Sequence, residues 1–264
     1  MQQHTLPDPL YVHLCFEAVH TPYDIAPGSP ADIDVYRGLV WRADVYVGEM
    51  VATLKARDMW DSTFIVYSAD NGGVGSGINY PLRGEKHSNW EGGMRTAAFV
   101  SGGLIPAAQR GTSNGVTMHI VDWWATFAVL AGEEAKDDPP VAPELGDLAD
   151  PYKNIYGDES FPPLDGVDLW PALTQPQSHA IDSAHKYLVL SKEVLIAANY
   201  KLLVSQPYFK SENNGWKDQN GTWSDDNGGL PMADCVNQDL PPAESFFPVP
   251  HNSSLRPCLF DIRK

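Results

Sequence analysis

Basic residues are scarce in this sequence. Its 264 residues include 18 lysines and arginines against 34 aspartates and glutamates, which gives a formal net charge of −16 at pH 7. Nucleic acids and anionic membrane surfaces are bound mainly through Lys and Arg, so we expect neither as a partner. A small anionic substrate stays open, because a few cations gathered in one place can override the charge of the whole molecule.

Long hydrophobic runs are also missing. No apolar stretch approaches the roughly 18 residues that a membrane helix needs. The first ten residues, MQQHTLPDPL, have neither the basic nor the apolar region of a signal peptide. We therefore expect no membrane span and no signal peptide in this chain. The hydrophobic fraction of 43% fits a globular protein with a core.

Cysteine is rare, with three in the whole chain. Cys15 lies in an apolar stretch and is predicted to be a buried structural thiol. Cys235 and Cys258 fall in a proline-rich tail, where a disulfide would stabilise the fold by about 3 kcal/mol. Two N-glycosylation sequons, at Asn220 and Asn252, lie in the same region, and together these features favour a secretory route.

The apolar patterns that are present predict an α/β fold. Residues 10–16 (LYVHLCF) and 63–68 (TFIVYS) are short, apolar and rich in β-formers, as buried strands are. Between them, residues 32–57 place apolar side chains three and four positions apart, which indicates an amphipathic helix. Strand, helix, strand is the pattern of a mostly parallel sheet flanked by helices.

Three further segments extend this portion of the chain. Residues 96–102 (TAAFVSG) are predicted to form a short strand. Residues 119–132 are predicted to form a helix, with Asp122 near its N-cap and Gly132 after its end. The acidic, proline-rich residues 133–165 are expected to form a surface loop.

The last part of the chain changes character. Residues 187–206 suggest two or three antiparallel strands, followed by a region rich in Asn, Gly, Pro and Asp. We therefore expect an α/β domain over residues 1–180 and a small C-terminal α+β subdomain with an antiparallel sheet over residues 181–264.

Polar side chains follow both strands of the predicted parallel sheet. Asp70 and Asn71 come directly after the strand at 63–68, and His20 follows the strand at 10–16. Ligands of open α/β sheets bind at the carboxyl ends of the strands, and oxygen ligands suit Ca²⁺ or Mg²⁺. The alternatives are an ordinary turn, which Asp, Asn and Gly all favour, and a structural histidine.

A local group of cations lies further along the chain. The stretch LRGEKHSNWEGG places Arg83, Lys86 and His87 within five positions, where they can stabilise charge on an oxyanion. The alternative is a solvated loop. Glu91 and Arg95, four apart, favour a local ion pair. A metal-ligand pair, a lysine and a histidine together describe a site that activates a tetrahedral anion, and they leave sulfate and phosphate both open.

These stretches resemble the type I, formylglycine-dependent sulfatases of the alkaline-phosphatase superfamily. FIVYSADNGG followed by PLRGEKHSNWEGGMR is similar to the family's DNGG and LRGxKxxxxEGGxR, and AVHTP is similar to its His-x-Pro. HIVDWWATFAVLAG resembles a family helix, although Ala125 replaces the usual proline. LDGVDLWPAL, NYKLL and CLFDI match as well. The nearest group is the arylsulfatase B-like enzymes, which act on sulfated amino sugars.

The resemblance implies roles for four residues. Asp70 and Asn71 would ligate Ca²⁺, Lys86 would contact the sulfate and the leaving group, and His20 would contact the sulfate and assist leaving-group protonation. The implied reaction is the hydrolysis of sulfate esters of sugars or aryl groups, in the secretory pathway, the lysosome or outside the cell. Arg83 and His87 match no family role.

Two parts of the family's site are missing. The nucleophile is a formylglycine made from Cys in a C-x-P-x-R motif, and no cysteine here lies in one. The paired aspartates that complete the Ca²⁺ site are also absent. We therefore expect the C-terminal part of a sulfatase, inactive alone, with an exposed sheet edge and apolar patch at residues 10–16. The alternatives are a phosphoester or phosphonate hydrolase and a non-catalytic fragment or pseudoenzyme.

Overall fold

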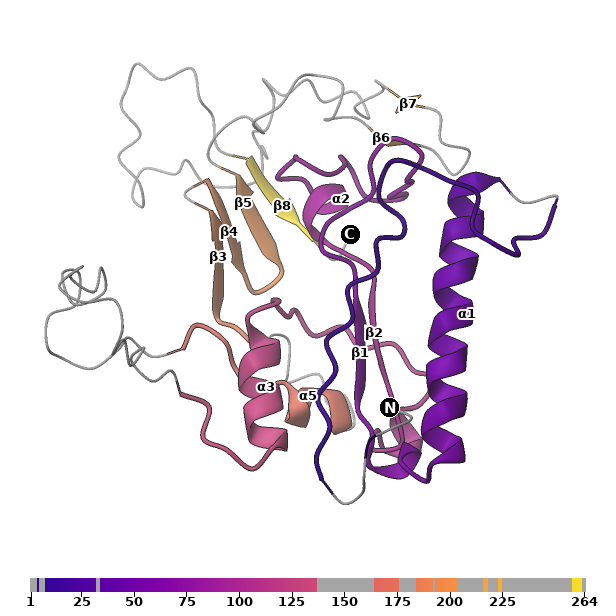
Figure 1. The fold of residues 1–264 in the computed structure, drawn as a ribbon. Coiled ribbons are helices and arrows are strands. Elements are labelled where there is room, and N and C mark those ends of the chain that lie inside the picture. Colours follow the sequence, from indigo (N-terminus) through magenta and orange to yellow (C-terminus); the bar gives the residue numbers. More distant parts are fainter. Residues whose placement is uncertain are drawn as a thin grey trace, which may run out of the picture. The chain divides into compact units, whose positions relative to one another are not determined.

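The computed structural model describes residues 4, 8–31, 34–136, 164–175, 184–191, 193–203, 216–217, 223–224 and 258–262. Figure 1 shows the helices and strands of the chain, coloured along the sequence. The chain divides into two compact units. The first contains Met1–Pro106 and Ser205–Pro257, and the second contains Ala107–Val204 and Cys258–Lys264. The predicted domain boundary near residue 180 stays a prediction.

Several sequence predictions fall outside the described residues. These are the sequons at Asn220 and Asn252, Cys235, and most of the acidic loop at 133–165. Cys258 begins strand β8, Cys258–Asp261, but its side chain is not described. The disulfide and the glycosylation sites therefore remain predictions.

The long helix of the first unit is α1, Val35–Ala56, as predicted for residues 32–57. It begins after Asp34, whose carboxylate accepts a hydrogen bond from the Arg37 backbone N–H at 2.9 Å. This N-cap satisfies one of the amide groups that the first turn leaves unpaired. The other elements of this unit are the 3₁₀ turn η1 (Trp60–Ser62), β1 (Ile65–Ser68), α2 (Glu91–Met94), β2 (Ala98–Ser101), β6 (Trp216–Lys217) and β7 (Trp223–Ser224).

Strands β1 and β2 confirm the two predicted strands at 63–68 and 96–102. They pair with each other in antiparallel register, with Tyr67 opposite Phe99. The rings of these two residues stack with centroids 4.9 Å apart. This cross-strand pair packs the short ribbon at the end that leads to Asp70.

Residues 10–16 do not form the predicted strand. They have no regular secondary structure, and Leu10, Tyr11, Val12 and Leu14 are between 40% and 71% exposed. A strand needs a neighbour for its backbone hydrogen bonds, and none of the described strands pairs with this segment. The predicted apolar patch is therefore present, but as loop side chains and not as a sheet edge.

The predicted parallel sheet is likewise absent from the described part of the chain. Every strand pair that the structure describes is antiparallel. Cys15 is exposed, with its Sγ 3.5 Å from His13 Nε2, so the prediction of a buried thiol is wrong. Burial of Cys15 would require a strand partner for this segment, and the described strands provide none. The predicted parallel sheet stays a prediction.

The second unit confirms the antiparallel strands predicted over 187–206. Strands β3 (Tyr187–Ser191), β4 (Val194–Ala197) and β5 (Tyr200–Leu203) form a sheet with β8 in the order β3-β4-β5-β8. Its inward side chains include Leu188, Val194, Ile196 and Leu203, all buried. The helical elements are η2 (Ala107–Gln109), α3 (Asp122–Leu130) and α5 (Trp170–Thr174). As predicted, Asp122 begins α3 and Gly132 follows its end with φ +82°.

Among the described residues, no helix combines the length and the apolar character that crossing a membrane requires.

Candidate functional site

The candidate site is built on two loops of the first unit. The loop after β1 carries Asp70 and Asn71, and the loop before α2 carries Lys86. Their backbones are joined directly, because Gly72 N–H donates to the Gly93 carbonyl at 2.9 Å and Lys86 N–H donates to the Gly73 carbonyl at 3.3 Å. The structure therefore brings together two stretches that the sequence places more than ten residues apart.

Asn79 strengthens this junction with its side-chain amide. Its Oδ1 accepts from the Gly73 N–H at 2.8 Å, and its Nδ2 donates to the carbonyls of Gly73 at 2.9 Å and Gly84 at 3.1 Å. One half-buried side chain thus satisfies backbone groups of both loops. Such pairing fixes the loops without regular secondary structure.

Glycine is required where the two loops touch. A Cβ built on Gly72 would overlap the carbonyl oxygen of Gly92, and a Cβ on Gly92 would overlap the carbonyls of Arg83 and Gly84. The neighbouring atoms are backbone, so a side chain could not move aside to make room. The glycines of the DNGG and EGG stretches therefore allow a contact between backbones that other residues would prevent.

The two predicted metal ligands lie just beyond the end of β1. Asp70 is exposed, and Asn71 is half-buried with its Nδ2 donating to the Gly72 carbonyl at 3.0 Å. A hydrogen bond from Nδ2 leaves the amide oxygen as the ligand atom of Asn71. The described residues contain no group of three or more His, Cys, Asp or Glu that could hold a metal ion.

His20 lies on a different loop, in the segment that follows residues 10–16. The side chain is exposed, and Nδ1 donates to the Thr21 carbonyl at 2.7 Å. Three residues later, the hydroxyl oxygen of Tyr23 lies 3.7 Å from the position of a Cβ on Gly75. The His20 loop therefore meets the glycine-rich loop that follows Asp70.

The predicted cations are held differently from one another. The Arg83 guanidinium lies 4.0 Å above the ring of Trp90, and burial lowers the pKa of Arg83. Lys86 is half-buried and His87 is exposed with φ +74°. Arg83 is therefore anchored on a buried aromatic ring, whereas Lys86 is tied to the metal-ligand loop through its backbone.

The ion pair predicted between Glu91 and Arg95 stays a prediction. The structure shows that these residues bracket α2, where the Arg95 N–H donates to the Glu91 carbonyl at 2.7 Å. Neither side chain is assigned to the candidate site.

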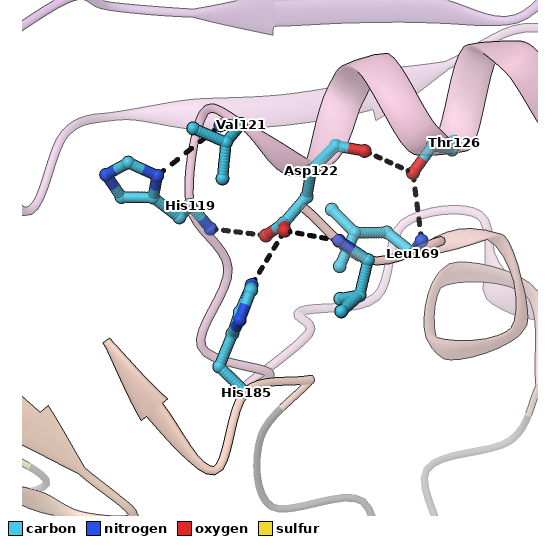
Figure 2. A network of polar contacts seen from close by, with 7 residues as sticks. His119, Val121, Asp122, Thr126, Leu169 and His185 are labelled. Atoms are coloured by element: carbon cyan, nitrogen blue, oxygen red, sulfur yellow. Dashed lines mark hydrogen bonds and ion pairs between the residues drawn. The ribbon is translucent and has the colours of Figure 1, made fainter. Parts of the chain in front are cut away.

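A buried carboxylate in the second unit is the main feature that the sequence did not reveal. Asp122 is fully buried, and Figure 2 shows His119 and His185 on either side of its carboxylate. Its Oδ1 lies 2.6 Å from His185 Nε2 and 3.0 Å from the Val167 N–H, and its Oδ2 accepts from the His119 N–H at 2.7 Å. The sequence placed Asp122 at a helix start but held no signal for His185, which lies 63 residues away.

The hydroxyl of Thr126 extends this network by one turn of α3. Its Oγ1 donates to the Asp122 carbonyl at 2.8 Å and accepts from the Leu169 N–H at 2.8 Å (Figure 2). All of these residues are buried or half-buried, and their polar atoms bond to one another. We interpret the network as a structural anchor within the second unit, separate in the chain from the loops of the candidate site.

Comparison with known proteins gives consistent results. Residues 1–133 match a family model described as Sulfatase. Arylsulfatase J of Mus musculus is 29% identical over 189 residues, covering 67% of this chain and 27% of that protein. Steryl-sulfatase of Rattus norvegicus is 27% identical over 196 residues, covering 68% of this chain and 28% of that protein. The chain thus spans a little over a quarter of the length of these relatives.

The fold is similar to that of a solved sulfatase. The crystal structure of the PsFucS1 sulfatase from Pseudoalteromonas sp. matches with a TM-score of 0.51 and 22% identity, covering 72% of this chain and 35% of that one. At this level of identity the likeness concerns the fold alone.

Proposed function

Because this chain belongs to the sulfatase family, we propose that it is the C-terminal part of an enzyme that hydrolyses sulfate esters. One observation supports the location of the site most directly. The backbone hydrogen bond from Lys86 to Gly73 joins the loop of the lysine to the loop of Asp70 and Asn71. An anion-binding cation and two oxygen ligands are thereby held on one rigid junction.

Asp70 and Asn71 fit a bound Ca²⁺ in their chemistry. A carboxylate oxygen and an amide oxygen are hard ligands of the kind that this ion prefers. When bound, the ion supplies positive charge that stabilises the oxygens of a sulfate group. Two residues fall short of the six to eight oxygens of a complete site, so the remaining ligands and the formylglycine nucleophile would come from a further part of the protein.

Lys86 and His20 would act on the ester itself. The Lys86 ammonium would pair with a sulfate oxygen and neutralise charge that grows on the leaving-group side. His20 would bind the sulfate and deliver a proton to the departing oxygen as a general acid. His20 is exposed, so its ring is open to a ligand.

The substrate class that we propose is a sulfated sugar or an aryl sulfate. A chain with net charge −16 offers few places for such an anion, and the local cations around Lys86 are one of them. In this proposal the complete protein acts in the secretory pathway, in the lysosome or outside the cell, where glycans at Asn220 and Asn252 and a disulfide between Cys235 and Cys258 would form.

A second candidate function is a non-catalytic sulfatase relative. The observation that favours it is the lack of a C-x-P-x-R motif in these 264 residues. Reading the coding sequence upstream of Met1 separates the two. An in-frame C-x-P-S-R supports the enzyme, and an upstream stop codon supports the second candidate.

Sulfate binding tests the site in the chain as it stands. We expect Lys86→Ala to weaken the affinity for inorganic sulfate about tenfold, because it removes a charge-assisted contact. Isothermal titration calorimetry measures the affinity. The matched control is Lys55→Ala, which makes the same charge change on α1, where Lys55 lies 4.9 Å from the Trp60 ring. Equal sulfate affinity in the two variants would remove Lys86 from the site.

A further inference from the structure

Three tyrosines of the first unit, Tyr23, Tyr36 and Tyr67, interact with one another, and none of them belongs to the predicted site. Tyr23 and Tyr36 meet edge to face, with ring centroids 5.7 Å apart and planes at 90°. Burial raises the pKa of Tyr36, and the phenols of Tyr23 and Tyr67 raise it further. The three side chains are half-buried, which leaves part of each accessible.

This tyrosine cluster adjoins two loops that carry predicted site residues, the His20 loop and the loop after β1. Tyr23 follows His20 by three residues, and Tyr67 precedes Asp70 by three. The Tyr23 hydroxyl also lies 3.7 Å from the position of a Cβ on Gly75, in the loop that continues from Asp70. Tyr23 is therefore the member of the cluster that spans the two loops.

The chemistry of the cluster suits a neutral, hydroxyl-bearing ring. A phenol offers an apolar ring together with a hydroxyl that both donates and accepts hydrogen bonds. A sugar presents C–H groups and hydroxyls in the same combination, whereas a simple aryl group has no hydroxyls to pair. The cations near Lys86 can bind the sulfate group, whereas the tyrosines can contact the sugar that carries it.

We propose that Tyr23 is a specificity-determining residue that hydrogen-bonds a hydroxyl of the sugar carrying the sulfate ester. Tyr36 holds the ring of Tyr23 in place by its edge-to-face contact, and it is itself fixed in the first turn of α1, two residues after the N-cap Asp34. The proposal rests on the proposed function for the identity of the neighbouring sulfate site. It narrows the substrate from aryl sulfates and sugar sulfates to sugar sulfates.

Calorimetry with two probes tests this assignment on the chain. We expect Tyr23→Phe to weaken binding of galactose 4-sulfate about three- to tenfold, the effect of one hydrogen bond, and to leave inorganic sulfate binding within about twofold. Tyr187→Phe is the matched control, because it removes the same hydroxyl from a side chain on β3 that is 57% exposed. It should change neither affinity. Circular dichroism during thermal unfolding confirms that both variants are folded.

Saturation-transfer NMR with unsulfated galactose separates this inference from the proposed function. Galactose contacts that are seen with the chain and lost in Tyr23→Phe support the assignment, even if inorganic sulfate binds nowhere and the sulfatase proposal fails. Two results would overturn it. One is unchanged galactose 4-sulfate affinity in folded Tyr23→Phe, and the other is the lack of any galactose contact with the unmodified chain.

Discussion

Single glycines decide whether the two loops of the candidate site can touch. At Gly72 the nearest atoms to an added Cβ are the carbonyl oxygen and carbon of Gly92, followed by the Cα of Gly93. Because these are backbone atoms, relief requires the loops to separate. Separation would break the Gly72–Gly93 hydrogen bond and move Lys86 away from Asp70.

We predict that Gly72→Ala lowers the free energy of unfolding by about 2 kcal/mol or more and weakens sulfate binding at the same time. Urea denaturation followed by circular dichroism measures the first effect, and calorimetry the second. Gly48→Ala is the control, since no atom lies within 4 Å of its added Cβ and α1 is helical there. It should stabilise the chain by about 0.5–1 kcal/mol. A Gly72→Ala variant as stable as the parent would contradict the packing described for the loops.

At the scale of elements, the helices were easier to predict than the pairing of strands. Helix α1 satisfies its own backbone hydrogen bonds, so its apolar spacing was sufficient to locate it. The strand pattern at residues 10–16 was real, but a strand also needs a partner, and the apolar pattern does not name one. The same limit hid the antiparallel pairing of β1 with β2, which a βαβ interpretation could not anticipate.

The candidate site also has some features that the sequence predicts and others that it does not. The sequence predicts motif residues such as Asp70 and Lys86 as site residues, because ligand chemistry and strand-end position are local properties. The backbone junction at Gly72 and the tyrosine cluster depend on how distant segments meet, and nothing local encodes Tyr23 lying beside Tyr36. Contacts of this kind, like that between Asp122 and His185, appear only after the chain folds.

Helix α3, the segment at 164–170 and the start of β3 are joined by the Asp122 carboxylate. We predict that Asp122→Ala lowers the free energy of unfolding by about 3 kcal/mol, because it leaves the His185 ring and two backbone N–H groups without their acceptor in a buried place. Urea denaturation measures the loss. Asp165→Ala, at an exposed position of the adjoining segment, should change stability by less than about 0.5 kcal/mol.

One result would contradict the anchoring role of the Asp122 carboxylate. If Asp122→Ala and Asp165→Ala unfold at the same urea concentration, the carboxylate does not hold the three elements together. Sulfate binding provides a second readout, because the loops of the candidate site belong to the other unit. We expect folded Asp122→Ala to bind inorganic sulfate as the parent does.

At the scale of the whole molecule, the chain is short compared with its relatives. It spans 27% and 28% of the length of the two mammalian relatives. In the proposed function, Asp70 and Asn71 would supply two side chains toward an ion that prefers six to eight oxygens, and water would have to replace each missing ligand. A site of this kind gains little binding free energy, because the ion keeps most of the water ligands that it has in solution. The affinity for Ca²⁺ therefore measures how complete the site is.

We predict that the isolated chain binds Ca²⁺ with a Kd of about 1 mM or weaker, the range of the weakest natural calcium sites. It should also hydrolyse no 4-nitrophenyl sulfate above the uncatalysed rate, because the sequence offers no nucleophile motif. Calorimetry and absorbance at the nitrophenolate band measure the two quantities. Asp70→Asn should weaken the remaining Ca²⁺ binding further, whereas Asp61→Asn, at an exposed position in η1, should not. Micromolar Ca²⁺ binding that survives Asp70→Asn would place the calcium ligands elsewhere in the chain. Micromolar Ca²⁺ binding that is lost in Asp70→Asn would show that the chain alone supplies a complete site around Asp70.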